Sequence, residues 1–433
     1  MAKKRAATRH KAVQKAAADQ MAIAPDYYAR FHCIGSDCED SCCSAGWRID
    51  IDRATWLRYQ SCPNETFAPL LREAIQLETR SDQKSQDRYA TLKLRPDLSC
   101  PFLTGDKLCM IHREMGGEAL SNICASYPRV VNRAGQFLEY GLAVSCPEAA
   151  RVVLLHETPT KLVTCAADPI FAGRDLTAFN LMIKSNEVQV VNQWRVLILR
   201  ILQWRELSLG ARMMLVGSLL DEVVRTRNSA RSKDLNAILP ALETYAALFA
   251  DPAYVESEYA LLQGNVPRKL QYVTGFLADF LASVNPRFKE CITAFADGLL
   301  GGLSRETSSN ASELLARYQK FHDDYYAPYF REKSYILENY LVNETLIKLF
   351  PFGEGSALDK YRAMVFNLAI IQVMLVGMAG HYRGLTDAHV IQFIQTFTRR
   401  SAHNDKYLGK LTEAIASKDA PSCVEVMWML KER

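Results

Sequence analysis

The chain has 433 residues, of which 49% are hydrophobic, and this length and composition support two or three domains with a sizeable buried core. The net charge of +4 is too small to argue for a nucleic-acid partner, and we expect none. The sequence opens without the apolar stretch and small-residue cleavage site of a secretory signal, so we expect a cytoplasmic protein.

Residues 1–25 form a basic, alanine-rich segment in which six Lys or Arg residues precede the first acid, Asp19. This pattern fits a basic amphipathic helix that contacts a membrane surface or an acidic partner, and it also fits a solvated, disordered tail. We expect the disordered tail, because chain ends are ordered only where other parts of the protein hold them.

Residues 26–170 carry short elements of mixed type. Alternating apolar residues predict strands over residues 47–51, 89–94 and 136–144. Asp52 is placed to cap a helix that runs through Trp56 and Tyr59. The pattern indicates a small mixed domain.

Residues 33–146 of this domain hold nine of the twelve cysteines, and in a reducing compartment such clustering indicates metal ligation or redox chemistry rather than disulfides. Over residues 33–43 the thiols are spaced so that one loop could direct several sulfurs at one point. The adjacent Cys42 and Cys43 diverge along the backbone, so one of them could be spare or bind a second ion. The candidate metal ligands are Cys33, Cys38, Cys42, Cys43, Cys100, Cys109, Cys124 and Cys146.

The later cysteines sit on predicted turns and ends of elements. A turn signal at residues 104–106 predicts a hairpin that brings Cys100 and Cys109 side by side. A short helix after Gly117 that ends at Pro128 would point Cys124 back toward this hairpin. Cys146 follows the predicted strand 136–144.

Two kinds of metal centre fit these thiols. Zinc held by four cysteines is one. An iron–sulfur cluster is the other, and we favour it because the ligands are nearly all cysteine, exceed what one zinc needs, and have apolar neighbours that would shield a cluster. His32 and His112 adjoin the motifs, and we expect them to form hydrogen bonds rather than bind the metal. The structural alternative is a set of free, buried cysteines.

From about residue 175 onward apolar residues recur at helical spacing, which predicts an all-helical domain over residues 171–433. The apolar stretch 363–380 is interrupted by Asn367 and Gln372, so we expect a buried core helix rather than a membrane span. The predicted fold class is therefore mostly α, with a small cysteine-rich mixed domain. The predicted helices cover residues 181–204, 211–224, 235–249, 270–284 and 363–378, with a further one through Asn343 that ends before Pro351.

A polar stripe falls on the helix through Asn343. Tyr335, Asn339 and Asn343 are spaced by four residues and share one face, with Tyr340 beside them. These four residues are candidate catalytic residues, and a hydrogen-bond network between packed helices is an equal alternative. Residues 318–340 also hold six tyrosines, which would suit a lysine or a sulfonium by cation–π attraction, although we favour an ordinary helix surface.

Several short segments of the sequence resemble the flagellin lysine-N-methylase (FliB-type) family. The cysteine motifs alone are also similar to a wider family of zinc- or iron-chelating cysteine-cluster proteins, and the late helical signature favours the methylase. The matching segments are residues 31–36 (FHCIGS) continuing through Cys38, Cys42 and Cys43 to 46–49 (GWRI), then 100–103 (CPFL), 109–112 (CMIH), 120–124 (LSNIC), 127–129 (YPR), 337–343 (LENYLVN) and 350–352 (FPF).

The resemblance implies methyl transfer from S-adenosylmethionine to lysine ε-amines of flagellin, with a 4Fe–4S cluster taking part. The residues themselves reveal no donor site. No glycine-rich loop joins a strand to a helix, and Cys43 follows Cys42 too early for a CxxxCxxC run. The competing hypothesis is a non-catalytic zinc- or iron-binding scaffold.

Overall fold

The computed structural model describes residues 21–79, 85–168, 171, 174, 176–229, 234–277, 285–301, 309–353, 355–401 and 423–432. The chain divides into two compact units, which we call the cysteine unit and the helical unit. The cysteine unit comprises residues 1–131, 137–149 and 162–178, and the helical unit comprises residues 132–136, 150–161 and 179–433. Residues 1–20 of the predicted tail lie outside the described residues.

A three-stranded antiparallel sheet organises the first part of the cysteine unit. Its order is β2 (Asp50–Ile51), β4 (Ala90–Leu92) and β3 (Ile75–Leu77). Asp52 caps the next helix, α2 (Arg53–Gln60), by accepting a hydrogen bond from the Thr55 amide at 2.8 Å, as the sequence predicted. The predicted strand 47–51 is thus a strand only over its last two residues.

Three further helices complete this part: α3 (Phe67–Ala74), α4 (Met110–Met115) and α5 (Asn122–Ser126). The strongly apolar face of α3 buries Phe67 and Leu71 against Ile51 and Phe102. Burial of such side chains stabilises the unit by about 1.5–3 kcal/mol each. The same core cluster includes Cys100, and Cys43, Cys62 and Cys109 pack against it.

A five-stranded sheet has the order β7 (Leu162–Ala166), β1 (Met21–Pro25), β6 (Phe137–Leu142), β5 (Arg129–Ala134) and β8 (Thr177–Leu181). Strand β1 pairs in parallel with β6 and antiparallel with β7. Two predictions need correction here. Residues 21–25 are a strand rather than a disordered tail, because two neighbouring strands satisfy their backbone groups. Strand β8 interrupts the predicted all-helical region 171–433.

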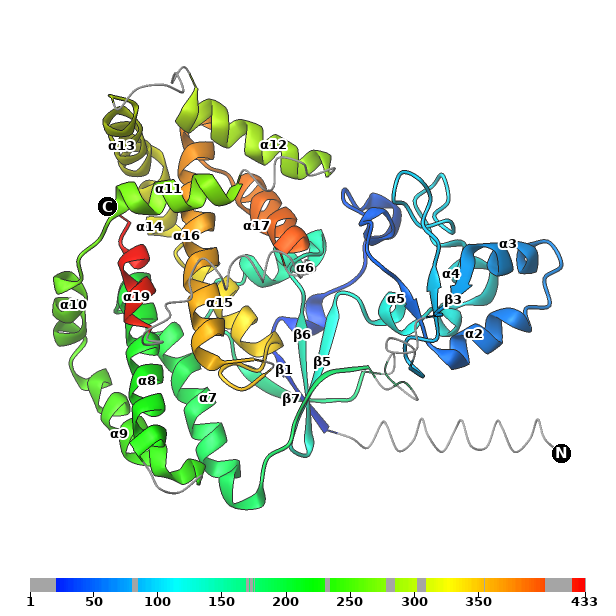
Figure 1. The fold of residues 1–433 in the computed structure, drawn as a ribbon, viewed down its shortest axis with the longest axis horizontal. Helices are drawn as coiled ribbons and strands as arrows, with labels where there is room; N and C mark the ends of the chain where they lie inside the picture. Colours follow the sequence, from blue (N-terminus) through cyan, green and yellow to red (C-terminus); the bar gives the residue numbers. More distant parts are fainter. Residues whose placement is uncertain are drawn as a thin grey trace. The chain divides into compact units, whose positions relative to one another are not determined.

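The helical unit is built around α16 (Ala357–Tyr382), shown in Figure 1. By length and composition α16 could cross a membrane, but 89% of its most apolar window is buried inside the protein, as predicted for a core helix. It contacts α8 (Leu209–Ser229), α11 (Val266–Leu277), α12 (Pro286–Phe295), α13 (Ser309–Phe321), α17 (Asp387–Ser401) and α19 (Val424–Met427).

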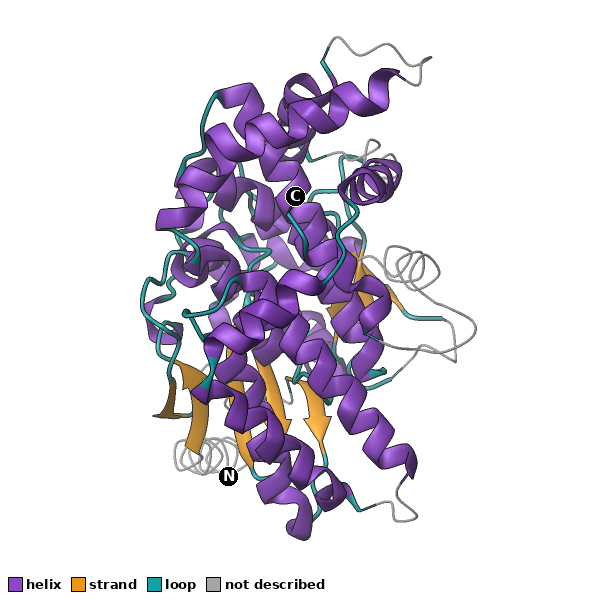
Figure 2. Ribbon diagram, turned by 90° about the vertical axis from the view of Figure 1, so that its left-hand side faces the viewer, coloured by secondary structure: helices purple, strands orange, loops and turns teal. Residues whose placement is uncertain are grey.

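Helices outnumber strands by far in Figure 2, so the fold is mostly α with a small mixed part, as predicted. Two π-helical turns, η10 (Ala296–Leu300) and η11 (His322–Tyr326), interrupt the regular helices and pack on α16. The remaining helices are α6 (Pro147–Leu154), α7 (Val188–Leu202), α9 (Leu239–Ala247), α10 (Pro252–Leu261), α14 (Ala327–Glu332) and α15 (Tyr335–Ile347).

Candidate metal centre

The first cysteine segment is a chain of short turns. Residues Gly35–Asp37 and Cys42–Ser44 form 3₁₀ turns, and the Cys43 amide donates to the Ser41 hydroxyl at 3.2 Å. Gly46 has a φ of +69°, and a Cβ there would lie 3.3 Å from Leu98 Cβ. A glycine therefore lets this segment turn closely over Leu98.

The second segment is the predicted hairpin. The Thr104 amide donates to the Leu108 carbonyl oxygen at 3.0 Å, and Leu103 and Cys109 form an antiparallel bridge. The Cys100 amide donates to the Cys43 carbonyl oxygen at 2.7 Å. This bond joins the hairpin directly to the first cysteine segment. The two segments must lie close together if both supply ligands to a single metal site.

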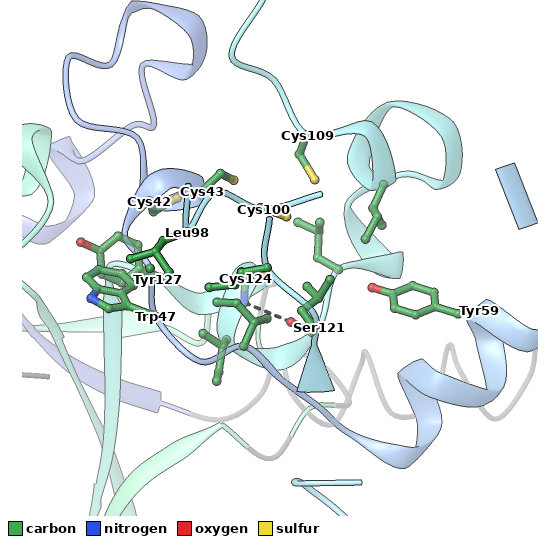
Figure 3. Close-up of a pocket in the computed structure, with 17 residues that line it drawn as sticks. Cys42, Cys43, Trp47, Tyr59, Leu98, Cys100, Cys109, Ser121, Cys124 and Tyr127 are labelled. Carbon is green, nitrogen blue, oxygen red and sulfur yellow. Dashed lines mark hydrogen bonds between the residues drawn. The ribbon is translucent and has the colours of Figure 1, made fainter. Parts of the chain in front are cut away.

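These segments and α5 enclose a cavity of about 140 Å³. Ser121 caps α5 by accepting from the Cys124 amide at 3.4 Å, which places Cys124 on the cavity wall. Apart from the thiols, the wall is mainly aliphatic and aromatic. Five cysteines line the cavity, together with three aromatic residues, as Figure 3 shows: Cys42, Cys43, Cys100, Cys109, Cys124, Trp47, Tyr59 and Tyr127.

Two of these thiols form a hydrogen bond with each other. The bond from Cys43 lowers the pKa of the Cys100 thiol, and the same bond raises the pKa of Cys43. Desolvation by the cavity wall raises the pKa of the Cys124 thiol. Of the wall thiols Cys43, Cys100, Cys109 and Cys124, Cys100 is the one whose pKa is lowered, which favours the thiolate, the form that binds metals.

The other three predicted ligands, Cys33, Cys38 and Cys146, do not line the cavity. Burial raises the pKa of Cys38, and the neighbouring Cys42 and Cys33 thiols raise it further. Burial raises the pKa of Cys146 to about 12, with smaller contributions from Cys38 and Cys42. Cys42, which lines the cavity, thus also lies within electrostatic reach of Cys38 and Cys146. Cys33 itself is exposed.

The donor set fits a thiolate-bound metal. Soft sulfur ligands select zinc or iron–sulfur clusters, and the apolar wall would keep water from a cluster. Among the residues that the structure describes, no three His, Cys, Asp or Glu side chains are arranged as a preformed ion site. Binding would therefore require the thiols to converge, and the ligand set stays a prediction.

The neighbouring histidines and the remaining cysteines lie outside the cavity wall. His32 Nδ1 lies 3.1 Å from the Arg30 carbonyl oxygen, and neither His32 nor His112 lines the cavity. Cys165 lies in strand β7, which pairs with β1. Cys291 and Cys423 are buried in the helical unit.

The four candidate catalytic residues all lie on α15. The Asn339 amide nitrogen donates to the His156 carbonyl oxygen at 2.7 Å and to that of Leu154 at 3.3 Å. Asn343 and Tyr340 are also buried, whereas Tyr335 is half-buried. These hydrogen bonds of Asn339 fit the alternative to a catalytic role, which was a hydrogen-bond network between packed segments. A catalytic role for the stripe stays a prediction.

Sequence reasoning missed the importance of Glu338 on the same helix. Its side chain is 1% exposed, and it accepts from Arg212 Nη1 at 2.7 Å and from Arg205 Nη2 at 2.9 Å. A charge inside the apolar run of residues 336–342 was the available signal. Tyr318 and Tyr326, part of the tyrosine-rich segment, are also buried rather than on a surface groove.

A thiol-lined cavity in a small mixed unit, attached to a large helical unit, defines a cysteine-cluster protein with a helical C-terminal domain. The family model for the FliB lysine N-methylase C-terminal domain matches residues 195–428, and the chain belongs to this family, as the resemblance indicated. The match lies within the helical unit and does not include the cysteine cavity.

Two curated relatives are similar over 131 residues. The lysine-N-methylase of Salmonella typhimurium (strain LT2) is 32% identical over 30% of this chain and 31% of its own length. The flagellar biosynthetic protein FliU of Salmonella muenchen is 31% identical over 30% of this chain and 75% of its own length. The matched part thus spans about a third of the first relative. No solved structure matches the chain.

Proposed function

We propose that this protein is a protein-lysine N-methyltransferase that transfers methyl groups from S-adenosylmethionine to ε-amines of flagellin lysines, with participation of a cysteine-ligated 4Fe–4S cluster. The family match over residues 195–428 carries the proposal. The printed names of the relatives, a lysine-N-methylase and a flagellar biosynthetic protein, support a lysine acceptor and a flagellar substrate.

The cluster would be held at the cysteine cavity. Cys42, Cys43, Cys100, Cys109 and Cys124 supply more thiols than one cluster needs. A 4Fe–4S cluster with three cysteine ligands leaves one iron free to bind a small molecule, or it supplies redox chemistry. Loading requires the Cys43 and Cys100 thiols to lose their protons, because thiolates are the ligands.

The cavity wall offers desolvation. A lysine ε-amine has a reference pKa of about 10.4, and an apolar environment lowers this pKa and favours the neutral, nucleophilic amine. Tyr59 is not the proton acceptor, because its hydroxyl donates to the Ala119 carbonyl oxygen at 2.7 Å. The wall therefore contributes water exclusion and positioning, which are the terms that alignment of donor and acceptor needs.

The test is mass spectrometry of flagellin co-expressed with the full chain. We expect lysine-specific mass increases of one or more methyl groups, and their absence on a well-expressed, metal-loaded protein would rule out this function. Cys291→Ser, in the helical unit, is the matched control, because it changes a buried cysteine that does not line the cavity.

A structural metal scaffold is the second candidate. One observation favours it: Cys100 belongs to the core cluster of the cysteine unit, with Cys43 and Cys109 packed against it, so a metal there would also hold the fold together. A colourless, zinc-containing protein would support the scaffold. Broad visible absorption from iron and sulfide would support the cluster.

A further inference from the structure

The helical unit buries a lysine among polar groups. Lys269 on α11 is 1% exposed, and a buried lysine is rare unless it has partners. Its Nζ donates to Gln372 Oε1 at 2.9 Å and to the Lys431 carbonyl oxygen at 3.2 Å. The amine is thus held on one side by α16 and on the other by the C-terminal segment.

The same segment places a carboxylate beside this lysine. Gln372 Nε2 donates to Glu432 Oε1 at 2.7 Å, and His322 Nε2 lies 3.2 Å from Glu432 Oε2. The other ring nitrogen of His322 lies 2.8 Å from Asp323 Oδ1, which fixes the direction of the ring. The Gln372 side chain therefore connects the lysine to the carboxylate: its oxygen accepts from Lys269 and its nitrogen donates to Glu432.

Aromatic rings surround His322, the partner of Glu432, and the backbone there forms a π-helical turn. The rings of Tyr318 and Tyr326 stack on that of His322, with centroid distances of 6.4 and 5.3 Å. His322 and Tyr326 lie in the π-helical turn η11, and such turns often occur at functional sites. The hydroxyl of Tyr318 is fully buried and has no hydrogen-bond partner among the described residues.

Residues 423–432, which we call the C-terminal strap, cover this site. Met427 and Leu430 are buried, and the Leu430 carbonyl oxygen accepts from the Tyr259 hydroxyl at 3.0 Å. The Glu432 side chain remains 39% exposed. The strap is therefore anchored by its apolar residues, and Glu432 reaches the site from its end.

We propose that Gln372 and His322 form a carboxylate-binding site of the helical unit, with Lys269 as the residue that positions Gln372. Glu432 is the resident ligand of this site, and a free aliphatic carboxylate can occupy the site in its place. The donors are held by contacts that do not involve Glu432: His322 by Asp323 and the two tyrosines, and Gln372 by Lys269. The site therefore keeps its shape when Glu432 leaves. The strap is its cover, and it controls access to the Lys269 amine.

Chemical rescue tests the site. In the full chain, Glu432→Ala should lower Tm by about 2–4 °C. Sodium acetate should restore Tm in a saturable manner, and sodium chloride of equal ionic strength should not. Glu425→Ala is the matched control: it removes the Glu425–Arg362 pair at 3.2 Å, on the same strap but outside the site, and acetate should not restore it.

Labelling of Lys269 by an amine-reactive reagent, read by mass spectrometry, is the second measurement. Lys269 should react about tenfold faster in Glu432→Ala than in the unchanged protein, and acetate should slow it again. If the alanine variant fails to fold, Glu432→Gln replaces it in the test. Acetate must then displace the neutral Gln side chain from the site, and it must still slow the labelling of Lys269. Acetate that changes neither Tm nor labelling, or that acts equally on Glu425→Ala, would overturn the proposal.

Discussion

Cys43 and Cys100 are joined twice: by a backbone hydrogen bond of 2.7 Å from the Cys100 amide to the Cys43 carbonyl oxygen, and by a hydrogen bond between their thiols. The first bond holds two distant chain segments together before any metal binds. The second lowers the pKa of Cys100 and raises the pKa of Cys43. Metal binding at this pair should become stronger as pH rises, because the metal binds thiolates and displaces their protons.

Cys100→Ser should lower the metal content of the purified protein. The hydroxyl is a poorer ligand for soft metals, and its burial in this core costs about 1–3 kcal/mol. Elemental analysis and urea denaturation measure the two effects. The control Cys291→Ser should lose stability without losing metal, because Cys291 is buried in α12. Equal metal content in the two variants would contradict the assignment of Cys100 as a ligand.

If the protein holds the proposed iron–sulfur cluster, its oxidative removal should abolish the proposed methylation and leave the helical fold intact. We expect this because the sequence contains no other recognisable anchor for the methyl donor. Methylation of flagellin lysines is measured before and after removal, with circular dichroism to show that the fold persists. Unchanged activity of the folded, cluster-free protein would show that the cluster has only a structural role.

Arg212→Ala should destabilise the helical unit strongly. The Arg212 side chain is buried against Glu338, and loss of one partner of a buried ion pair costs about 3–5 kcal/mol. Arg205→Ala is the matched control: this arginine pairs with the same carboxylate but is 35% exposed, so about 0–1 kcal/mol is expected. Urea denaturation compares the two, and similar losses would argue against Glu338 as a buried charge.

The His322–Glu432 contact should make stability fall with rising pH. Burial alone would lower the pKa of His322, but Glu432 and Asp323 more than offset it, so the folded pKa lies above the usual 6.5. The stabilisation is fully present below pH 6.5 and is lost as pH rises through the folded pKa. Thermal denaturation of His322→Gln across this range should lack the decline. A parallel decline in the variant would assign it to another group.

Lys269 should act in the opposite direction at higher pH. Burial lowers its pKa from 10.5 to about 8, so the folded state releases the proton more readily than the unfolded state. The cost of burying the charge is fully present below pH 8 and disappears between pH 8 and 10.5. The stability of the protein relative to Lys269→Met should therefore rise across that interval. A flat difference would mean that the lysine is not buried as a charged group.

Several features were predictable because their signals are local in the chain. Asp52 caps α2 through the amide of a residue three positions later, and the turn at residues 104–106 closes a hairpin over a few residues. Helical spacing of apolar residues predicted α7, α8, α15 and α16 for the same reason. The cysteine content likewise identified the thiol chemistry of the site, since residue type alone determines which metals a ligand favours.

The tertiary structure alone decided which distant residues meet. Residues 21–25 alternate too briefly to predict a strand, and their partner in β6 lies more than a hundred residues away. Five of the eight candidate cysteines line the cavity while Cys62 packs against the core, although all are the same residue type. Lys269 and Glu432 likewise lie far apart in the sequence and share one amide, that of Gln372. Periodicity reports which face of an element is apolar, but contacts between distant segments depend on how those faces pack together.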